Sequence, residues 1–147
     1  MDKLFPILSQ MKTSLDELEA IMIEEVNQLN RPQINPVSLQ VLTDNKSQLL
    51  STIQYYDELR QQEELELKVS APYKHQTKLF TCWQQVTQTV QNTKNLNLKV
   101  EELLSMHVKR NERLKKVVES AGGGNNLYGA GGEASSTTTG RVYNISV

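Results

Sequence analysis

The sequence predicts an all-α protein: an antiparallel three-helix, up-down-up bundle with coiled-coil character, a long third helix and a flexible C-terminal tail. All seven glycines lie at or after Gly122, and the helix-favouring residues Leu, Gln, Glu and Lys dominate the chain before it. Apolar residues in that part recur at alternating steps of four and three, which is the period of a helix with one buried face. We therefore divide the chain into a helical body, residues 1–121, and a Gly-, Ser- and Thr-rich tail, residues 122–147.

The first helix is expected at about residues 2–30 and the second at about 36–70. The stripe of the first consists of Leu4, Leu8, Met11, Leu15, Leu18, Met22, Val26 and Leu29. Pro32 and Pro36 interrupt the pattern, because proline has no N–H to donate and restricts the residue before it. Asn35 with Pro36 forms an N-cap and first-turn pair that begins the second helix, and Ala71-Pro72 ends it. The stripe of the second consists of Leu39, Leu42, Leu49, Ile53 and Tyr56, passing through Lys46 and extended by Leu59 and Leu67.

The third helix is expected at about residues 73–121 and carries the longest stripe. Its members are Leu79, Trp83, Val86, Val90, Thr93, Asn97, Val100, Leu104, His107, Asn111, Leu114 and Val118. At 1.5 Å per residue it would reach about 70 Å, against about 43 Å and about 50 Å for the first and second helices. Its far end either projects with an unpaired apolar face or breaks near residues 92–95 and folds back as a fourth helix. Projection is favoured, because no Gly or Pro marks a turn there.

Composition and charge exclude several classes of function. Sixteen Lys and Arg against 17 Asp and Glu give a net charge of -1, which disfavours a dedicated nucleic-acid binder. The single cysteine, Cys82, cannot form an internal disulfide and fits a reducing compartment, so the cytoplasm is expected. No apolar run approaches the length of a membrane span, so no membrane insertion is expected. The basic cluster at Lys109, Arg110, Arg113, Lys115 and Lys116 is interpreted as a solvated helix face in preference to an RNA or membrane site.

No residue pattern indicates catalysis, a metal or a cofactor. His75 and Cys82 are seven residues apart on one face of the predicted helix, but no glycine-bearing oxyanion loop accompanies them. A small buried thiol beside Trp83 is the preferred interpretation of Cys82. The Glu-x-x-His pairs of di-metal bundles are missing before both His75 and His107. We therefore expect no enzyme, no catalytic residue, no metal site and no cofactor.

Binding is the function that the third stripe favours. Its polar members Thr93, Asn97, His107 and Asn111 indicate either simple solvent exposure or a groove with mixed apolar and polar contacts, and binding is preferred. The predicted client-binding band, placed beyond the reach of the first two helices, consists of Asn97, Val100, Leu103, Leu104, Val108, Asn111, Leu114 and Val118. In the tail, Leu127 and Tyr128 are large apolar residues in a polar segment, which suggests a short recognition segment that orders on binding.

Scattered residues in both body and tail resemble a known family. They are Ile34-Asn35 followed by Leu39, Thr43, Lys46, Ser47, Leu49 and Leu50; Leu96-Asn97, Leu103-Leu104 and Arg110-Asn111; and Leu127-Tyr128-Gly129. Their order and spacing, together with the chain length, are similar to those of the FlgN family of flagellar type III export chaperones. The resemblance covers nearly the whole chain.

The resemblance implies a cytoplasmic chaperone for bacterial flagellum assembly. It would bind the hook-filament junction (hook-associated) proteins near their terminal helices, prevent their premature assembly and deliver them to the flagellar type III export gate. The resemblance also implies that the tail segment Leu127, Tyr128 and Gly129 docks on the cytoplasmic domain of that gate, with the export ATPase complex as a further candidate partner. The alternatives are a generic coiled-coil adapter or homodimeric structural protein and, less favoured, a basic-helix RNA binder.

Overall fold

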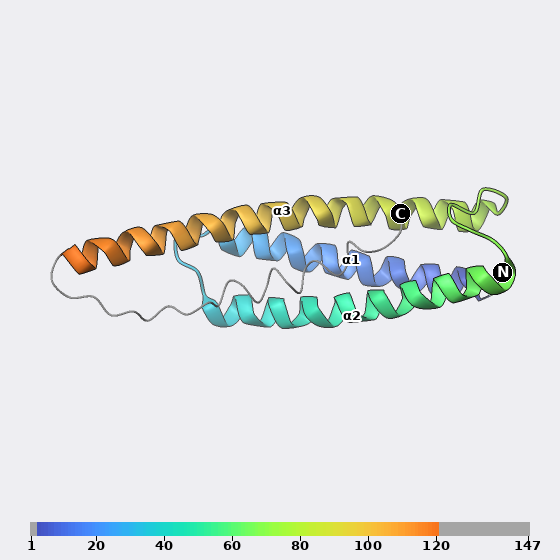
Figure 1. Ribbon diagram of the computed structural model, residues 1–147, viewed down its shortest axis with the longest axis horizontal. Helices are drawn as coiled ribbons and strands as arrows, with labels where there is room; N and C mark the ends of the chain where they lie inside the picture. Colours follow the sequence, from blue (N-terminus) through green and yellow to red (C-terminus); the bar gives the residue numbers. More distant parts are fainter. Residues whose placement is uncertain (1–2, 121–147) are drawn as a thin grey trace.

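The computed structural model describes residues 3–120, which form three long helices (Figure 1). They are α1 (Leu4–Leu29), α2 (Pro36–Leu67) and α3 (Thr77–Ser120). The predicted all-α bundle is confirmed, and each observed helix lies within its expected range. The predicted tail, residues 122–147, lies outside the described residues.

The start of α2 has the local structure expected from its sequence. The Asn35 side-chain oxygen accepts hydrogen bonds from the backbone N–H groups of Val37 and Ser38, at 3.1 and 3.2 Å. These two donors have no partner within the helix, and Pro36 at the first helical position has no N–H to leave unsatisfied. Asn35 and Pro36 therefore fix where the second helix begins.

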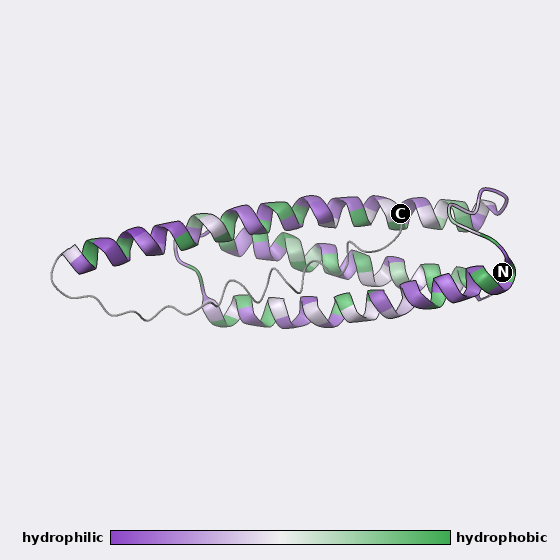
Figure 2. Ribbon diagram, in the orientation of Figure 1, coloured by the Kyte–Doolittle hydropathy of each residue, from purple (hydrophilic) through white to green (hydrophobic). Residues whose placement is uncertain are grey.

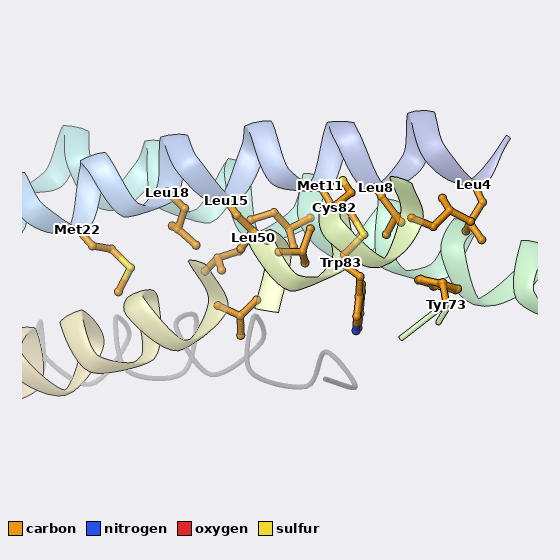
Figure 3. Close-up of a cluster of buried hydrophobic side chains, with 14 residues drawn as sticks. Leu4, Leu8, Met11, Leu15, Leu18, Met22, Leu50, Tyr73, Cys82 and Trp83 are labelled. Atoms are coloured by element: carbon orange, nitrogen blue, oxygen red, sulfur yellow. The ribbon is translucent and has the colours of Figure 1, made fainter. Parts of the chain in front are cut away.

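The first helix, α1, lies at the centre and packs against both α2 and α3 (Figure 1). Its stripe is buried as predicted except at Val26, which is half-buried. Figure 3 shows the side chains from Leu4 to Met22 in a row along one side of the helix. The main core cluster consists of Leu4, Leu8, Met11, Leu15, Leu18 and Met22 of α1, Leu50 and Ile53 of α2, Tyr73, and Leu79, Cys82, Trp83, Val86 and Val90 of α3. Burial of this apolar surface is the main favourable contribution to folding.

A second, smaller cluster lies where α1 ends. Leu29, Val100 and Leu103 are buried there, and Val26, Ile34, Leu39 and Leu104 pack against them. Along each helix, buried polar residues separate the two clusters: Glu25 in α1, Lys46 in α2, and Thr93 and Asn97 in α3. The bundle thus has two apolar clusters with a polar layer between them.

The third helix is continuous over 44 residues. Its length of about 66 Å exceeds the roughly 39 Å of α1, and Figure 1 shows it projecting past the end of α1 and the start of α2. Within the segment where a break was considered, Gln88 donates to Asn92 and Gln91 to Asn95, so the amides pair along the helix. The projecting arrangement is therefore confirmed, and the fold-back alternative is wrong. None of the helices in residues 3–120 combines the length and hydropathy needed to cross a bilayer.

Candidate partner-binding site

The projecting end of α3 exposes large apolar side chains. From Val108 to Ser120 every residue except Lys115 is exposed, and Leu114 and Val118 expose 57% and 49% of their surface. Leu114 follows Val100 and His107 at intervals of seven, so the exposed stripe continues the one that is covered farther back. Met106 and Val117 are also exposed, and Figure 2 shows apolar and polar residues alternating along this end. We call Met106, Leu114, Val117 and Val118 the overhang face.

A depression of about 290 Å³ lies at the base of the overhang face. Its lining residues are Leu29, Asn30, Arg31 and Pro32 at the end of α1, and Leu103, Met106, His107 and Arg110 of α3. The Nε2 atom of His107 lies 2.6 Å from the backbone oxygen of Leu29. The last carbonyls of a helix have no partner within the helix, so this contact satisfies one of them and ties the end of α1 to α3.

Half of the predicted client-binding band is not a free surface. Asn97, Val100 and Leu103 expose only 7%, 3% and 6% of their surface, and Leu104 is partly buried against the second cluster. The prediction that these residues lie beyond the first two helices is therefore wrong. The physical reason is that the end of α1 reaches as far along α3 as His107, whose Nε2 lies 2.6 Å from the Leu29 backbone oxygen.

The remaining predicted residues, Val108, Asn111, Leu114 and Val118, are exposed. Met106 and Val117 of the overhang face were missed, because they lie on the neighbouring row of the helix and not on the stripe that was followed. An apolar face about 100° wide around the helix axis, as is usual for an amphipathic helix, would have included both residues.

The polar members of the third stripe do not form one exposed surface. Thr93 is fully buried, and its hydroxyl donates to the Val90 carbonyl oxygen at 2.8 Å. The Asn97 amide donates to Glu101 at 3.3 Å, while its buried side-chain oxygen has no hydrogen-bond partner among the described residues. The expectation of exposure is thus wrong for these two residues. It holds for Asn111, whereas His107 is half-buried.

Buried charges on α2 were not predicted. The leucine pattern placed Leu42, Leu49 and Tyr56 on the buried side, but these are only half-buried. The buried residues of α2 are Lys46 and Ile53, which lie on the predicted stripe, and Leu50, Asp57 and Arg60, which do not. The Lys46 ammonium lies 3.0 Å from a carboxylate oxygen of Glu25, so the two charges compensate each other inside the polar layer.

A second buried charged group joins the end of α2 to α3. The Arg60 guanidinium donates to Asp57 and Glu64, at 3.0 Å each, and lies 4.6 Å from the centre of the Trp83 ring. The Tyr73 hydroxyl donates to the Glu64 carboxylate at 2.6 Å. Burial raises the pKa of this hydroxyl, which keeps it protonated as a donor. Both carboxylates have partners within this group, which suits it to holding the fold together.

The residues considered for catalysis are not brought together. Cys82 is buried in the main cluster, as predicted, and burial raises the pKa of its thiol. His75 is exposed and precedes α3, so the prediction that it shares a helical face with Cys82 is wrong. Within residues 3–120, no three His, Cys, Asp or Glu side chains are grouped so that they could hold a metal ion.

Comparison with known proteins gives a consistent result over nearly the whole chain. A family model described as "FlgN protein" matches residues 1–136. "Flagella synthesis protein FlgN" of Salmonella typhimurium is 33% identical over 140 residues, which cover 95% of this chain and 96% of that protein. The protein of the same name from Escherichia coli is 31% identical over 140 residues, with the same coverage, and that of Yersinia enterocolitica is 28% identical over 138 residues, covering 94% and 93%. No solved structure matches the chain.

Proposed function

Because this chain belongs to the FlgN family, we propose that it acts in flagella synthesis as a cytoplasmic export chaperone. Its clients are the hook-filament junction (hook-associated) proteins, which it keeps from assembling prematurely and delivers to the flagellar type III export gate. The role is one of binding, with no catalytic step and no cofactor. The observation that carries the proposal is the overhang face, an apolar surface that no other described part of the chain covers.

The overhang face suits an amphipathic helix of the client. Leu114, Val117 and Val118 lie within one turn of each other, and Met106 extends the surface toward the depression. A client helix laid along this surface would bury its own apolar stripe against them. That stripe is also what would drive premature coiled-coil assembly of the client, so covering it would block assembly. Asn111 would orient the client helix through polar contacts.

We assign export-gate docking to the tail segment Leu127, Tyr128 and Gly129, which lies outside the described residues. A tyrosine supplies a large contact area at a low cost in side-chain entropy, and the neighbouring glycine allows close backbone approach. The partner is the cytoplasmic domain of the gate, with the export ATPase complex as a second candidate. In this proposal the client and the gate bind different parts of the chain.

The proposal is tested by isothermal titration of purified junction proteins into the full-length chain. Leu114→Ala should weaken client binding by more than about 1 kcal/mol, as truncation of an interface anchor does. Leu98→Ala is the matched control, because Leu98 is an exposed leucine of α3 that lies away from the overhang face. Equal binding by the unmodified chain and both variants would exclude the overhang face as the client site.

The main alternative is a coiled-coil adapter or homodimer in which the overhang face pairs with a second copy. The molar mass of the protein in solution, measured with and without client, distinguishes the two functions. A dimer that persists beside bound client would contradict use of one surface for both purposes, whereas a 1:1 complex supports the chaperone.

A further inference from the structure

Charged residues are distributed unevenly around the overhang face. The segment from Met106 to Ser120 contains five cations and two carboxylates, a net charge of +3 in a chain whose overall charge is -1. The cations are Lys109, Arg110, Arg113, Lys115 and Lys116, and the carboxylates are Glu112 and Glu119. A local excess of this size influences which partners approach the surface.

The two carboxylates lie away from the apolar face. Glu112 is three residues after Lys109 and four before Lys116, and Glu119 is three after Lys116. At these spacings opposite charges attract along a helix, so this row is balanced within itself. This row, which also contains Glu102, lies on the side of α3 opposite Leu114.

The two arginines beside the apolar face have no such balance. Arg110 and Arg113 alternate with Met106 and Val117 at steps of four, three and four, so all four share one edge of the overhang face. Lys115 borders the other edge, but Glu112 and Glu119 are three residues before it and four after it and can balance its charge. Among residues 3–120, neither Arg110 nor Arg113 forms an ion pair.

The depression at the base of the overhang face also combines apolar residues with arginines. Its lining includes the apolar residues Leu29, Leu103 and Met106 and the arginines Arg31 and Arg110. Among residues 3–120, the one ion pair of Arg31 is with Glu24, at 3.9 Å. A volume of about 290 Å³ is small for an organic ligand and suits a side chain. Guanidinium groups beside such a pocket favour a neighbouring carboxylate, which they can bind through two parallel hydrogen bonds.

We propose that the partner of the overhang face is an amphipathic helix whose apolar stripe is flanked by carboxylates. One apolar side chain of that helix enters the depression, and a carboxylate beside it pairs with Arg110 and Arg31. The inference rests on the proposed function, which supplies a client helix, and adds the charge by which the helix is recognised. A second copy of this chain would bring the same cations to the interface, so like-charge repulsion disfavours self-pairing through this face.

Two designed helical peptides test the inference on the purified full-length chain. Both carry the same leucine stripe, but one has glutamates and the other lysines along its edges. The glutamate peptide should bind roughly tenfold more tightly at low salt, and the difference should shrink as salt screens the charges. The double variant Arg110→Glu/Arg113→Glu should remove or reverse this preference.

The matched control is Lys109→Glu/Lys116→Glu, which makes the same change in net charge on the opposite side of α3. All four side chains are exposed, so both double variants should retain the helix content of the unmodified chain. Equal binding of the two peptides, or an equal effect of the two double variants, would overturn the inference. Comparable loss of binding to a single-stranded RNA by both variants would show a general polyanion surface and would also overturn it.

The junction proteins separate failure of this inference from failure of the proposed function. If both double variants bind them as the unmodified chain does, the charge inference fails and the proposed function stands. If the unmodified chain binds no junction protein but still prefers the glutamate peptide, the proposed client is wrong and the recognition chemistry stands.

Discussion

The imidazole Nε2 of His107 in α3 lies 2.6 Å from the backbone oxygen of Leu29 at the end of α1. The contact joins residues 78 positions apart at the point where α3 leaves the bundle. On one side of it lie the buried Val100 and Leu103, and on the other the exposed Leu114 and Val118. His107 therefore marks the boundary between the core and the overhang face.

Replacement of His107 should loosen this boundary. His107→Ala removes the partner of a helix-terminal carbonyl and should lower the free energy of unfolding by about 1 kcal/mol, measured by urea denaturation. Asn111→Ala, one turn farther along the same side but exposed, is the control and should change stability by less than about 0.5 kcal/mol. Equal stability of the two variants would mean that the contact with Leu29 contributes nothing.

Two leucines of α3 should differ in their contribution to stability. Leu103 is buried in the second cluster, so Leu103→Ala should lower the unfolding free energy by about 2–5 kcal/mol. Leu114 is exposed, so Leu114→Ala should leave stability within about 0.5 kcal/mol. Thermal and urea unfolding of both variants measure this. Heavy destabilisation by Leu114→Ala would show that the overhang face is covered within the protein.

The first helix shows how much of the fold could be predicted from sequence. Its stripe consists of leucines, methionines and one valine, and hydropathy predicts the burial of most of its members. The second helix differs, because Arg60 and Asp57 are buried as a hydrogen-bonded pair, which a count of apolar residues assigns to the surface. In the folded chain Trp83 and Tyr73 also contact Arg60, and these contacts cannot be predicted from the spacing within one helix. The spacing of Asp57, Arg60 and Glu64, at steps of three and four, was the available signal.

The sequence predicted an overhanging third helix with an exposed apolar face, but not the residue at which the overhang begins. The length of the third apolar stripe indicated that the third helix exceeds its partners, and the observed helix of 44 residues confirms this. Where the overhang begins depends on how α1 and α3 are paired. In the structure the end of α1 lies beside His107 of α3. Val100 and Leu103 therefore pack against Leu29 in the core and do not lie on the predicted surface.

The Tyr73 hydroxyl should make stability depend on alkaline pH. Burial raises the pKa of this group above its ordinary value near 10, so its contribution to stability is complete below about pH 10 and is lost as pH rises beyond that. Urea unfolding between pH 8 and pH 11 should show a decline that is shallower in Tyr73→Phe. Burial also raises the pKa of the Cys82 thiol, so the difference between wild type and variant isolates the tyrosine. If the unfolding free energies of the wild type and Tyr73→Phe decline in parallel with pH, Tyr73 is not the cause of the decline.

Removal of the tail should leave the body folded. The predicted stripes end before Gly122, and the described core contains no residue beyond Leu103. A chain ending at Ala121 should therefore keep its helix content and its melting temperature to within about 4 °C, which is roughly 1 kcal/mol for a domain of this size. Circular dichroism melts of the full and shortened chains provide the measurement. A larger drop would show that residues 122–147 stabilise the body.

The two proposed activities of the chain should be separable at Tyr128. Because the proposed gate-docking segment lies outside the client surface, Tyr128→Ala should leave client affinity within about 0.5 kcal/mol, as expected for a remote change. Export of the junction proteins should nevertheless fall, because the variant loses the aromatic anchor that would hold the gate's cytoplasmic domain. Client titration, gate-domain binding and secretion of junction proteins are measured for Tyr128→Ala and for the control Tyr143→Ala. Tyr143 is also a tyrosine of the tail segment, but it lies outside the proposed docking residues. Normal export and gate binding by Tyr128→Ala would remove the docking role, and loss of client binding would show that the two activities share one site.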